Sequence, residues 1–216
     1  MDVAAKSELR ALPGGHSHSP DPHLSLVRAY QGVLAALGDL GYPVATDENF
    51  AGTADRAARA MLDLVKPAAE VEEEMQELLS CTFPARYAGV VVSRNNRCFG
   101  ICPHHLLPVS YRVSVAYHPE SRVLGISKLS RLIRLLARRP ILQEDLTHEL
   151  AVALHEGLDS RGSAVHVEGE HLCLMARGAE AREAQVTTSA VRGIFETDPA
   201  TRREFFALAS SPRPAD

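Results

Sequence analysis

The chain has 216 residues, of which 45% are hydrophobic, and its formal net charge is −4. A length in this range is typical of one domain with a small extension. The negative charge argues against a nucleic-acid surface built on phosphate contacts. No apolar run approaches the ~20 residues that cross a bilayer, and the first residues lack the apolar core of a signal peptide. We therefore expect a cytoplasmic protein with neither a nucleic-acid nor a membrane partner.

The N-terminal part of the chain is organised by helical patterns and prolines. Residues 1–22 combine glycine, proline and alternating His and Ser, which is typical of a disordered tail. Apolar spacing predicts helices over 24–40, 54–64 and 69–79, the second of them capped by Thr53. The expected organisation is a tail at 1–22, a helical extension at 23–80, a main domain at 81–209 and a second tail at 210–216.

From residue 87 onward, short alternating segments replace the helical period. Strands are expected over 87–93, 109–117 and 123–126, helices over 127–138 and 143–158, strands over 164–170 and 185–189, and a final helix over 199–208. Pro140 separates the two central helices. Antiparallel hairpins on either side of a helix pair predict an α+β domain with its helices on one sheet face.

Thiol and imidazole side chains gather in two short clusters, Cys102-Pro103-His104-His105 and His171-Leu172-Cys173. A catalytic zinc site takes three N or S ligands. Cys102 and His105 have a spacing that a turn can present to one ion, and Cys173 would be the third ligand. In an extended segment His171 and Cys173 share a face. His104 and His171 would then lie beside the metal, where imidazoles suit acid–base work.

Two other interpretations of these clusters stay open. Cysteines in a chain this long do not form a disulfide framework, but buried free cysteines usually only pack. Cys81 and Cys98 have no paired histidine and are interpreted as packing residues. A purely structural zinc site would need a fourth protein ligand, which only His104 or His171 could provide.

A basic segment, Ser127-Lys128-Leu129-Ser130-Arg131, opens a predicted helix directly after a strand. Helix N-termini bind anions, and Lys128 and Arg131 lie one turn apart on a common face. Arg177 follows Cys173 closely and could point into the same cavity. Three cations suit a triphosphate. The alternative is a solvated basic face.

The pair Gln143-Glu144 begins the second central helix. A carboxylate there can accept two hydrogen bonds from a guanine edge while it favours the positive end of the helix dipole. The alternative is an ordinary acidic first turn.

In combination these residues resemble the GTP cyclohydrolase I family. The family motifs are C-E-H-H-L-L-P, V-A-Y-x-P, G-L-S-K-x-x-R, Q-E-R-L-T, H-x-C-x-x-x-R-G and T-S-A-x-x-G-x-F. The corresponding segments here are 102–108, 115–119, 125–131, 143–147, 171–178 and 188–195. Thr53-Ala54-Asp55-Arg56 stands, in a looser match, where the family usually has T-P-x-R.

The resemblance implies a tunnelling fold, in which strand-strand-helix-helix-strand-strand units of several subunits join into a barrel. It implies a homodecamer of two stacked pentamers, with active sites between subunits. The implied reaction is the zinc-dependent conversion of GTP to 7,8-dihydroneopterin triphosphate and formate, by ring opening, ribose rearrangement and ring closure. This reaction feeds folate or pterin synthesis.

Position by position, the resemblance also implies the site residues. Cys102, His105 and Cys173 would hold Zn²⁺, and His104 and His171 would move protons at N7 and the ring oxygen. The residues implied in substrate binding are Gln143 and Glu144 at the guanine, Ser127, Lys128, Arg131 and Arg177 at the ribose and triphosphate, and Arg59, reaching the triphosphate from a neighbouring subunit.

The chain departs from the family pattern at several positions. Pro103 replaces the glutamate of C-E-H-H, which removes a carboxylate beside the metal. Ala54 replaces the usual proline, Asp145 stands where arginine is common, and 109–111 differ from the usual continuation. Pro103 leaves room for an alternative. The chain would then be a diverged paralogue that binds a purine nucleotide and either stops at ring opening or acts as a non-catalytic regulatory subunit.

Overall fold

The computed structural model describes residues 21–209. The chain forms two compact units that divide between residues 62 and 63. The tails expected at 1–22 and 210–216 lie outside the described residues, except that Asp21 and Pro22 begin the first helix. Each unit is described by itself.

The first unit contains the helices α1 (Pro22–Asp39), η1 (Glu48–Phe50, a 3-10 turn) and α2 (Thr53–Leu64). The Asp21 carboxylate caps α1 by accepting a hydrogen bond from the His23 amide at 3.0 Å. His23 also contacts Asp55 across a distance of 3.1 Å, which joins α1 to α2. Both helices confirm the predictions for 24–40 and 54–64. Among the described residues, no helix is long and apolar enough to span a membrane.

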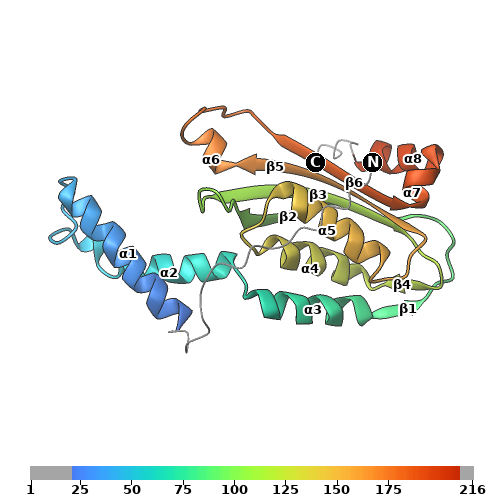
Figure 1. The fold of residues 1–216 in the computed structure, drawn as a ribbon, viewed down its shortest axis with the longest axis horizontal. Coiled ribbons are helices and arrows are strands. Elements are labelled where there is room, and N and C mark those ends of the chain that lie inside the picture. Colours follow the sequence, from blue (N-terminus) through green and yellow to red (C-terminus); the bar gives the residue numbers. More distant parts are fainter. Residues whose placement is uncertain (1–20, 210–216) are drawn as a thin grey trace, which may run out of the picture. The chain divides into compact units, whose positions relative to one another are not determined.

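The second unit combines antiparallel sheets with helices (Figure 1). Its elements are α3 (Ala68–Ser80), β1 (Thr82–Pro84), β2 (Val91–Ile101), β3 (Pro108–His118), β4 (Arg122–Leu124), α4 (Ile126–Ala137), α5 (Gln143–His155), β5 (Gly162–His171), α6 (Leu172–Met175), β6 (Val186–Gly193), α7 (Ile194–Thr197) and α8 (Pro199–Ala209). The main sheet has the order β2-β3-β5-β6, and β1 pairs with β4 in a small second sheet. The predicted α+β architecture, with a helix pair between two hairpins, is confirmed.

The main core lies between the sheet and the helices α4 and α5. Tyr111, Val113 and Val115 of β3 are fully or almost fully buried on this face, because alternate side chains of a strand point the same way. They meet Leu132 and Leu150 of the two helices, both without exposed surface. Burial of each such side chain contributes roughly 1.5–3 kcal/mol. The helix pair thus covers one sheet face, as the sequence predicted.

A smaller core on the opposite face was not predicted. Ala116 and Ala164 occupy the alternate positions of β3 and β5, and they pack against Phe195 and Phe205 of α7 and α8. The two phenylalanine rings meet edge to face at 6.2 Å. Strand β3 is therefore buried on both faces near its C-terminal end, where the sequence pattern indicated one polar face.

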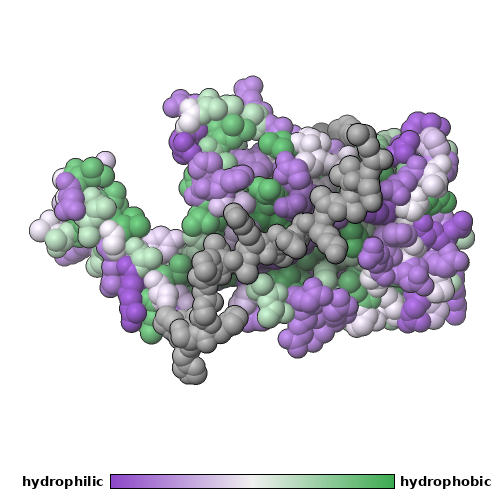
Figure 2. Space-filling model, viewed as in Figure 1, coloured by the Kyte–Doolittle hydropathy of each residue, from purple (hydrophilic) through white to green (hydrophobic). Residues whose placement is uncertain are grey.

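Helix α3 packs on α4 and belongs to the sheet unit. Its apolar stripe of Val71, Leu78 and Leu79 is buried in the main core, whereas its glutamates face outward. The surface over α3 in the viewed face is accordingly hydrophilic (Figure 2). The division between the two units, after residue 62, lies before α3.

Strand β2 is longer than the predicted segment 87–93 and is displaced toward the C-terminus. A bulge between Ser93 and Asn96 interrupts its pairing with β3, and Asn95 has a φ of 58°. The Asn96 side chain donates to the Val113 carbonyl at 3.2 Å and accepts from Ser130 at 2.8 Å. The polar run at this bulge has no alternating pattern, which explains why the strand was not recognised beyond residue 93.

Candidate active site

The turn between β2 and β3 presents the first cluster of thiol and imidazole groups. The Cys102 amide donates to the Leu107 carbonyl at 3.0 Å, and the Leu106 amide donates to the Cys102 carbonyl at 2.9 Å. Leu106 completes the turn with a φ of 53°. The turn buries Cys102 and leaves His104 and His105 exposed. Both predicted ligands of the motif therefore come from one closed turn.

Strand pairing brings the second cluster to the same place. His171 is the last residue of β5 and pairs with Val109 at the start of β3. The prediction that 171–173 is extended is wrong, because α6 begins at Leu172. Cys173 reaches the turn because the chain enters the helix α6 directly after His171. His171 and Cys173 are therefore not brought together by the alternation of side chains along a strand.

The predicted zinc ligands meet. Ligand atoms of Cys102, His105 and Cys173 all lie within 4.8 Å of one another, and Cys102 Sγ lies 3.9 Å from His105 Nδ1. Ligands of tetrahedral zinc lie roughly 3.5–3.8 Å apart, given zinc–sulfur and zinc–nitrogen bonds near 2.3 and 2.0 Å. Two thiols and one imidazole at this spacing fit zinc after a small contraction. Neither His104 nor His171 belongs to this group in the described chain.

The electrostatics of the thiol pair favour a cation. Burial raises the pKa of Cys173, and so do the hydrogen bond and the negative charge of the neighbouring Cys102. Two adjacent thiols resist joint ionisation for this reason. A bound metal ion reverses the balance because it deprotonates the thiols that coordinate it.

His171 is held by Gln143, the first residue of α5. Its Nε2 atom lies 2.9 Å from Gln143 Oε1, and its ring meets Tyr111 edge to face at 6.2 Å. Burial lowers the pKa of His171, although the nearby carboxylate of Glu144 acts in the opposite direction. The neutral imidazole is therefore favoured at neutral pH.

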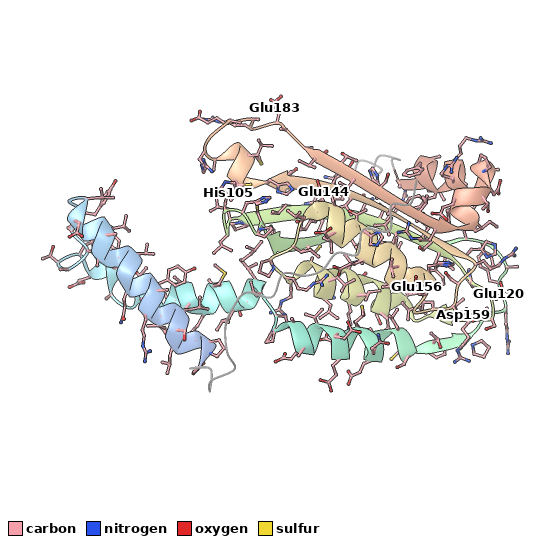
Figure 3. The ribbon with its side chains drawn as sticks, in the orientation of Figure 1. His105, Glu120, Glu144, Glu156, Asp159 and Glu183 are labelled. Atoms are coloured by element: carbon pink, nitrogen blue, oxygen red, sulfur yellow. The ribbon has the colours of Figure 1, made fainter. Side chains whose placement is uncertain are left out.

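A cavity of about 170 Å³ joins these groups. Polar and charged parts of its lining come from Cys102, His104, Gln143, Glu144 and His171. Its remaining walls are Pro103, Ile141, Leu142 and Val186. His105 and Glu144 lie toward the same end of the sheet, whereas Glu120, Glu156 and Asp159 lie toward the other end (Figure 3). One predicted metal ligand, Cys102, thus borders the same space as two imidazoles and one carboxylate.

Gln143 and Glu144 differ in where their side chains lie. Gln143 is 2% exposed, and its amide nitrogen donates to the carbonyls of Val167 and Val186 at 3.2 and 2.9 Å. Glu144 is exposed and lines the cavity. Both ends of the Gln143 amide are engaged inside the protein, so of the two residues expected at guanine only Glu144 has its polar group free for a ligand.

The basic residues of α4 lie elsewhere in this chain. Lys128 and Arg131 line a separate cavity of about 360 Å³ with Lys66, Cys81, Leu78 and four glutamates of α3. The C-terminal end of α4 packs beside β2. Gly100 of β2 has no side chain, and the Ala137 carbonyl oxygen comes so close that a Cβ added at Gly100 would lie 2.7 Å from that oxygen. Lys128 lies nine residues before Ala137, which is about 14 Å away along the helix axis. One chain therefore does not bring Lys128 and Arg131 to the Cys102 turn.

The remaining predicted residues occupy three settings. Ser127 is exposed at the start of α4, next to Lys128. Arg177 follows α6 and is near enough to Cys173 to lower the pKa of that thiol in part. Arg59 lies on α2 in the first unit, where its 70% exposed side chain pairs with Asp55 at 3.0 Å.

Sequence reasoning missed two parts of the site. Tyr111 is 1% exposed, and burial and nearby thiols and Glu144 raise the pKa of its hydroxyl. Its alternating strand pattern indicated only a core position. Gly169 lies opposite Tyr111 in β5, and a Cβ there would lie 2.1 Å from Gln143 Oε1. No sequence signal connected this glycine to Gln143.

The comparisons with known proteins agree with this geometry. The family model for GTP cyclohydrolase I matches residues 27–210. GTP cyclohydrolase 1 of Alkalilimnicola ehrlichii is 36% identical over 185 residues, covering 85% of this chain and 96% of the relative. The Pseudoalteromonas translucida protein of that name is 35% identical and covers 86% and 98%. A Campylobacter curvus relative of the same name is 41% identical over 66% of this chain and 75% of its own. The chain is thus an enzyme of the GTP cyclohydrolase I family and has the tunnelling fold.

Proposed function

We propose that this chain is a zinc-dependent enzyme that converts GTP to 7,8-dihydroneopterin triphosphate and formate. One observation carries the proposal: Cys102, His105 and Cys173 converge within 4.8 Å, and Cys102 also lines the cavity that Glu144 and His171 enclose. A binding module has little use for so many proton-transfer groups around one metal site. The relatives named GTP cyclohydrolase 1 support the same activity.

Cys102, His105 and Cys173 would hold the zinc ion. Zinc with three protein ligands supplies a bound water whose pKa is lowered toward neutrality. His104 and His171 would exchange protons with guanine N7 and the ribose ring oxygen. Burial keeps His171 neutral, so that it can accept a proton, and His104 is exposed at the edge of the cavity.

Glu144 would hold the guanine by accepting hydrogen bonds from the ring N–H and the exocyclic amine. Each charged hydrogen bond of this kind contributes roughly 1.5–3 kcal/mol. The amide of Gln143 is engaged inside the protein. We therefore assign the side-chain contact with guanine to Glu144 alone.

Active sites would lie between copies of the chain. Strands β2 and β6 are the edges of the main sheet, and open edges pair readily with strands of another chain. We propose a homo-oligomer, a decamer of two stacked pentamers, in which Ser127, Lys128 and Arg131 complete the site of a neighbouring copy. Arg177 would act in its own copy, and Arg59 would reach the triphosphate from a neighbouring subunit.

The enzyme would act in the cytoplasm. All four cysteines are free, which suits a reducing compartment, where thiols remain available as metal ligands.

The test follows two products on one sample. Zinc-loaded protein is incubated with GTP, and formate, the oxidised fluorescent pterin and bound metal are measured together. The expected result is equal release of formate and pterin with about one zinc per chain. Absence of both products would contradict the proposal.

Pro103 favours a second candidate function, because it lines the cavity directly beside Cys102. This candidate binds a purine nucleotide and either stops after ring opening or regulates another enzyme without turnover. Accumulation of a ring-opened formamide, seen by mass spectrometry, would indicate the first form. GTP binding without any product would indicate the second.

A further inference from the structure

The amide of Gln143 has only one orientation that satisfies its neighbours. Its Nε2 atom lies within 3.2 Å of the Val167 and Val186 carbonyls and of Thr188 Oγ1. A carbonyl oxygen can only accept, so the group facing two carbonyls must be the NH₂. A flipped amide would place Oε1 against two carbonyl oxygens, none of which can donate, in a buried space. The assignment of nitrogen and oxygen therefore follows from the chemistry of the neighbours.

This orientation determines where His171 carries its proton. Gln143 Oε1 is an acceptor with no hydrogen, and it lies 2.9 Å from His171 Nε2. Nε2 must donate, so the neutral ring carries its hydrogen on Nε2 and a lone pair on Nδ1.

The surrounding structure holds the pair rigidly. The Thr147 hydroxyl donates to the main-chain carbonyl of Gln143 at 2.7 Å and lies 2.6 Å from Thr188 Oγ1, which in turn contacts the Gln143 amide nitrogen. Gly169 leaves room for the contact, since a Cβ there would lie 3.1 Å from His171 Nε2 as well as against the amide. Two strands and one helix thus converge on a side chain that is 2% exposed.

We propose that Gln143 is a positioning residue that holds the His171 ring by its Nε2–H, which fixes the neutral tautomer and leaves the Nδ1 lone pair as the acceptor that the ring can offer to the substrate. The inference rests on the proposed function only in naming the substrate. It changes the role of Gln143 from a guanine contact to a group that acts through His171. A wrong tautomer would present an N–H to the substrate where a lone pair is needed.

The test compares Gln143→Met with Gln143→Glu in the zinc-loaded, full-length enzyme. Methionine has a similar length but neither donates nor accepts strongly. A protonated glutamic acid can donate to a strand carbonyl and accept from Nε2–H, as the amide does. Gln76→Met, at an exposed position on α3, is the matched control.

We expect Gln143→Met to lower kcat by about 10- to 100-fold while KM for GTP stays within about twofold. Gln143→Glu should recover most of this loss, and Gln76→Met should change neither constant. A higher KM with unchanged kcat would show a direct substrate contact and overturn the inference. So would equal losses in the Met and Glu variants.

A second readout does not need turnover. Ring ¹⁵N chemical shifts distinguish the two neutral tautomers, and the His171 signals are identified by their loss in His171→Asn. Solid-state spectra of labelled wild-type protein should show the proton on Nε2, and Gln143→Met should shift the balance toward Nδ1. A wild-type proton on Nδ1 would refute the inference. An inactive wild-type enzyme with the Nε2 tautomer would instead refute only the proposed function.

Discussion

The four cysteines differ in the surroundings of their sulfur atoms. Cys98 has no partner histidine, and burial raises its pKa to about 12, so it stays a neutral packing group, as the sequence indicated. Cys102 and Cys173 lie beside each other and beside His105. Of the four thiols, only these two lie beside an imidazole nitrogen that could share a metal ion with them. The turn at Cys102 brings that imidazole into place.

Cys173→Ser should lose zinc and activity together, because a neutral hydroxyl is a poor zinc ligand. His104→Ala should keep about one zinc per chain and lower kcat by about 10²- to 10⁴-fold, the usual contribution of an acid–base group. Metal analysis and steady-state kinetics on the same preparations check both. Loss of zinc in the His104 variant would mean that His104, rather than His105, is a ligand.

Glu144→Gln should lower kcat/KM for GTP by about 10- to 100-fold, since it removes a charged hydrogen bond to guanine. Asp145→Asn is the control, because Asp145 is a neighbouring exposed acid of the same first turn. Kinetics with GTP separate the two variants. Equal effects would show a general role of negative charge at the start of α5 and would contradict a specific contact.

At the scale of elements, α7 and α8 cover the sheet face for which the sequence pattern predicts polar, exposed side chains. Phe205 is fully buried between Ala116, Ala164 and Phe195. The first three residues of α8 are anchored by Asp198, which accepts from the Ala200 and Thr201 amides at 3.0 and 3.1 Å. Hydrogen bonds from Thr201 and Ala200 lower the pKa of Asp198, so this cap stays ionised at neutral pH.

Phe205→Ala should lower the free energy of unfolding by about 3–5 kcal/mol, through lost burial and the cavity left behind. Leu208→Ala, at a position that is 40% exposed, should change it by less than about 1 kcal/mol. Denaturant unfolding of zinc-loaded protein measures both. Similar values for the two variants would mean that α8 is not part of the folded core.

The elements that the sequence predicted well have a single periodic pattern. Helices α1 to α5 and strand β3 carry continuous apolar stripes, and their predicted bounds differ from the structure by a few residues. The bulge at Asn95 and the coil at Leu172 have no such pattern. Both depend on tertiary contacts, namely the Asn96 bonds to Val113 and Ser130 and the packing of α6 on β3 and β5. The buried state of Gln143 could not be predicted either, because its acceptors belong to strands 24 and 43 residues away.

At the scale of the whole molecule, the predicted site residues fall into two groups at different ends of the sheet unit. The residues proposed to bind metal and to move protons assemble within one chain, whereas Lys128 and Arg131 border a different cavity. Residue types and spacing predict both groups. The sequence does not predict that they lie apart within one chain, because this depends on the direction in which α4 runs from the sheet. In the proposed homo-oligomer, a complete site would take its residues from more than one copy.

Two inactive variants should restore activity when they share an oligomer. A His104→Ala chain keeps the basic residues, and a Lys128→Ala/Arg131→Ala chain keeps the metal side. If each site takes its two halves from different copies, an equal random mixture regenerates about a quarter of the sites. Co-expression followed by a GTP turnover assay measures this fraction. Activity that stays at the level of the single variants would place all these residues in one chain's site.

The pairing of Val109 with His171 has a consequence for how the chain reaches its native register. A slip of β5 by one residue would turn every side chain of that strand to the opposite face and move Cys173 by about 3.4 Å. The three ligands would then be too far apart for one small ion. Zinc would therefore bind only the correctly paired sheet and would stabilise it by a free energy that grows with the logarithm of its affinity. The same metal ion that takes part in the proposed reaction would also favour the native register of β5 over a shifted one.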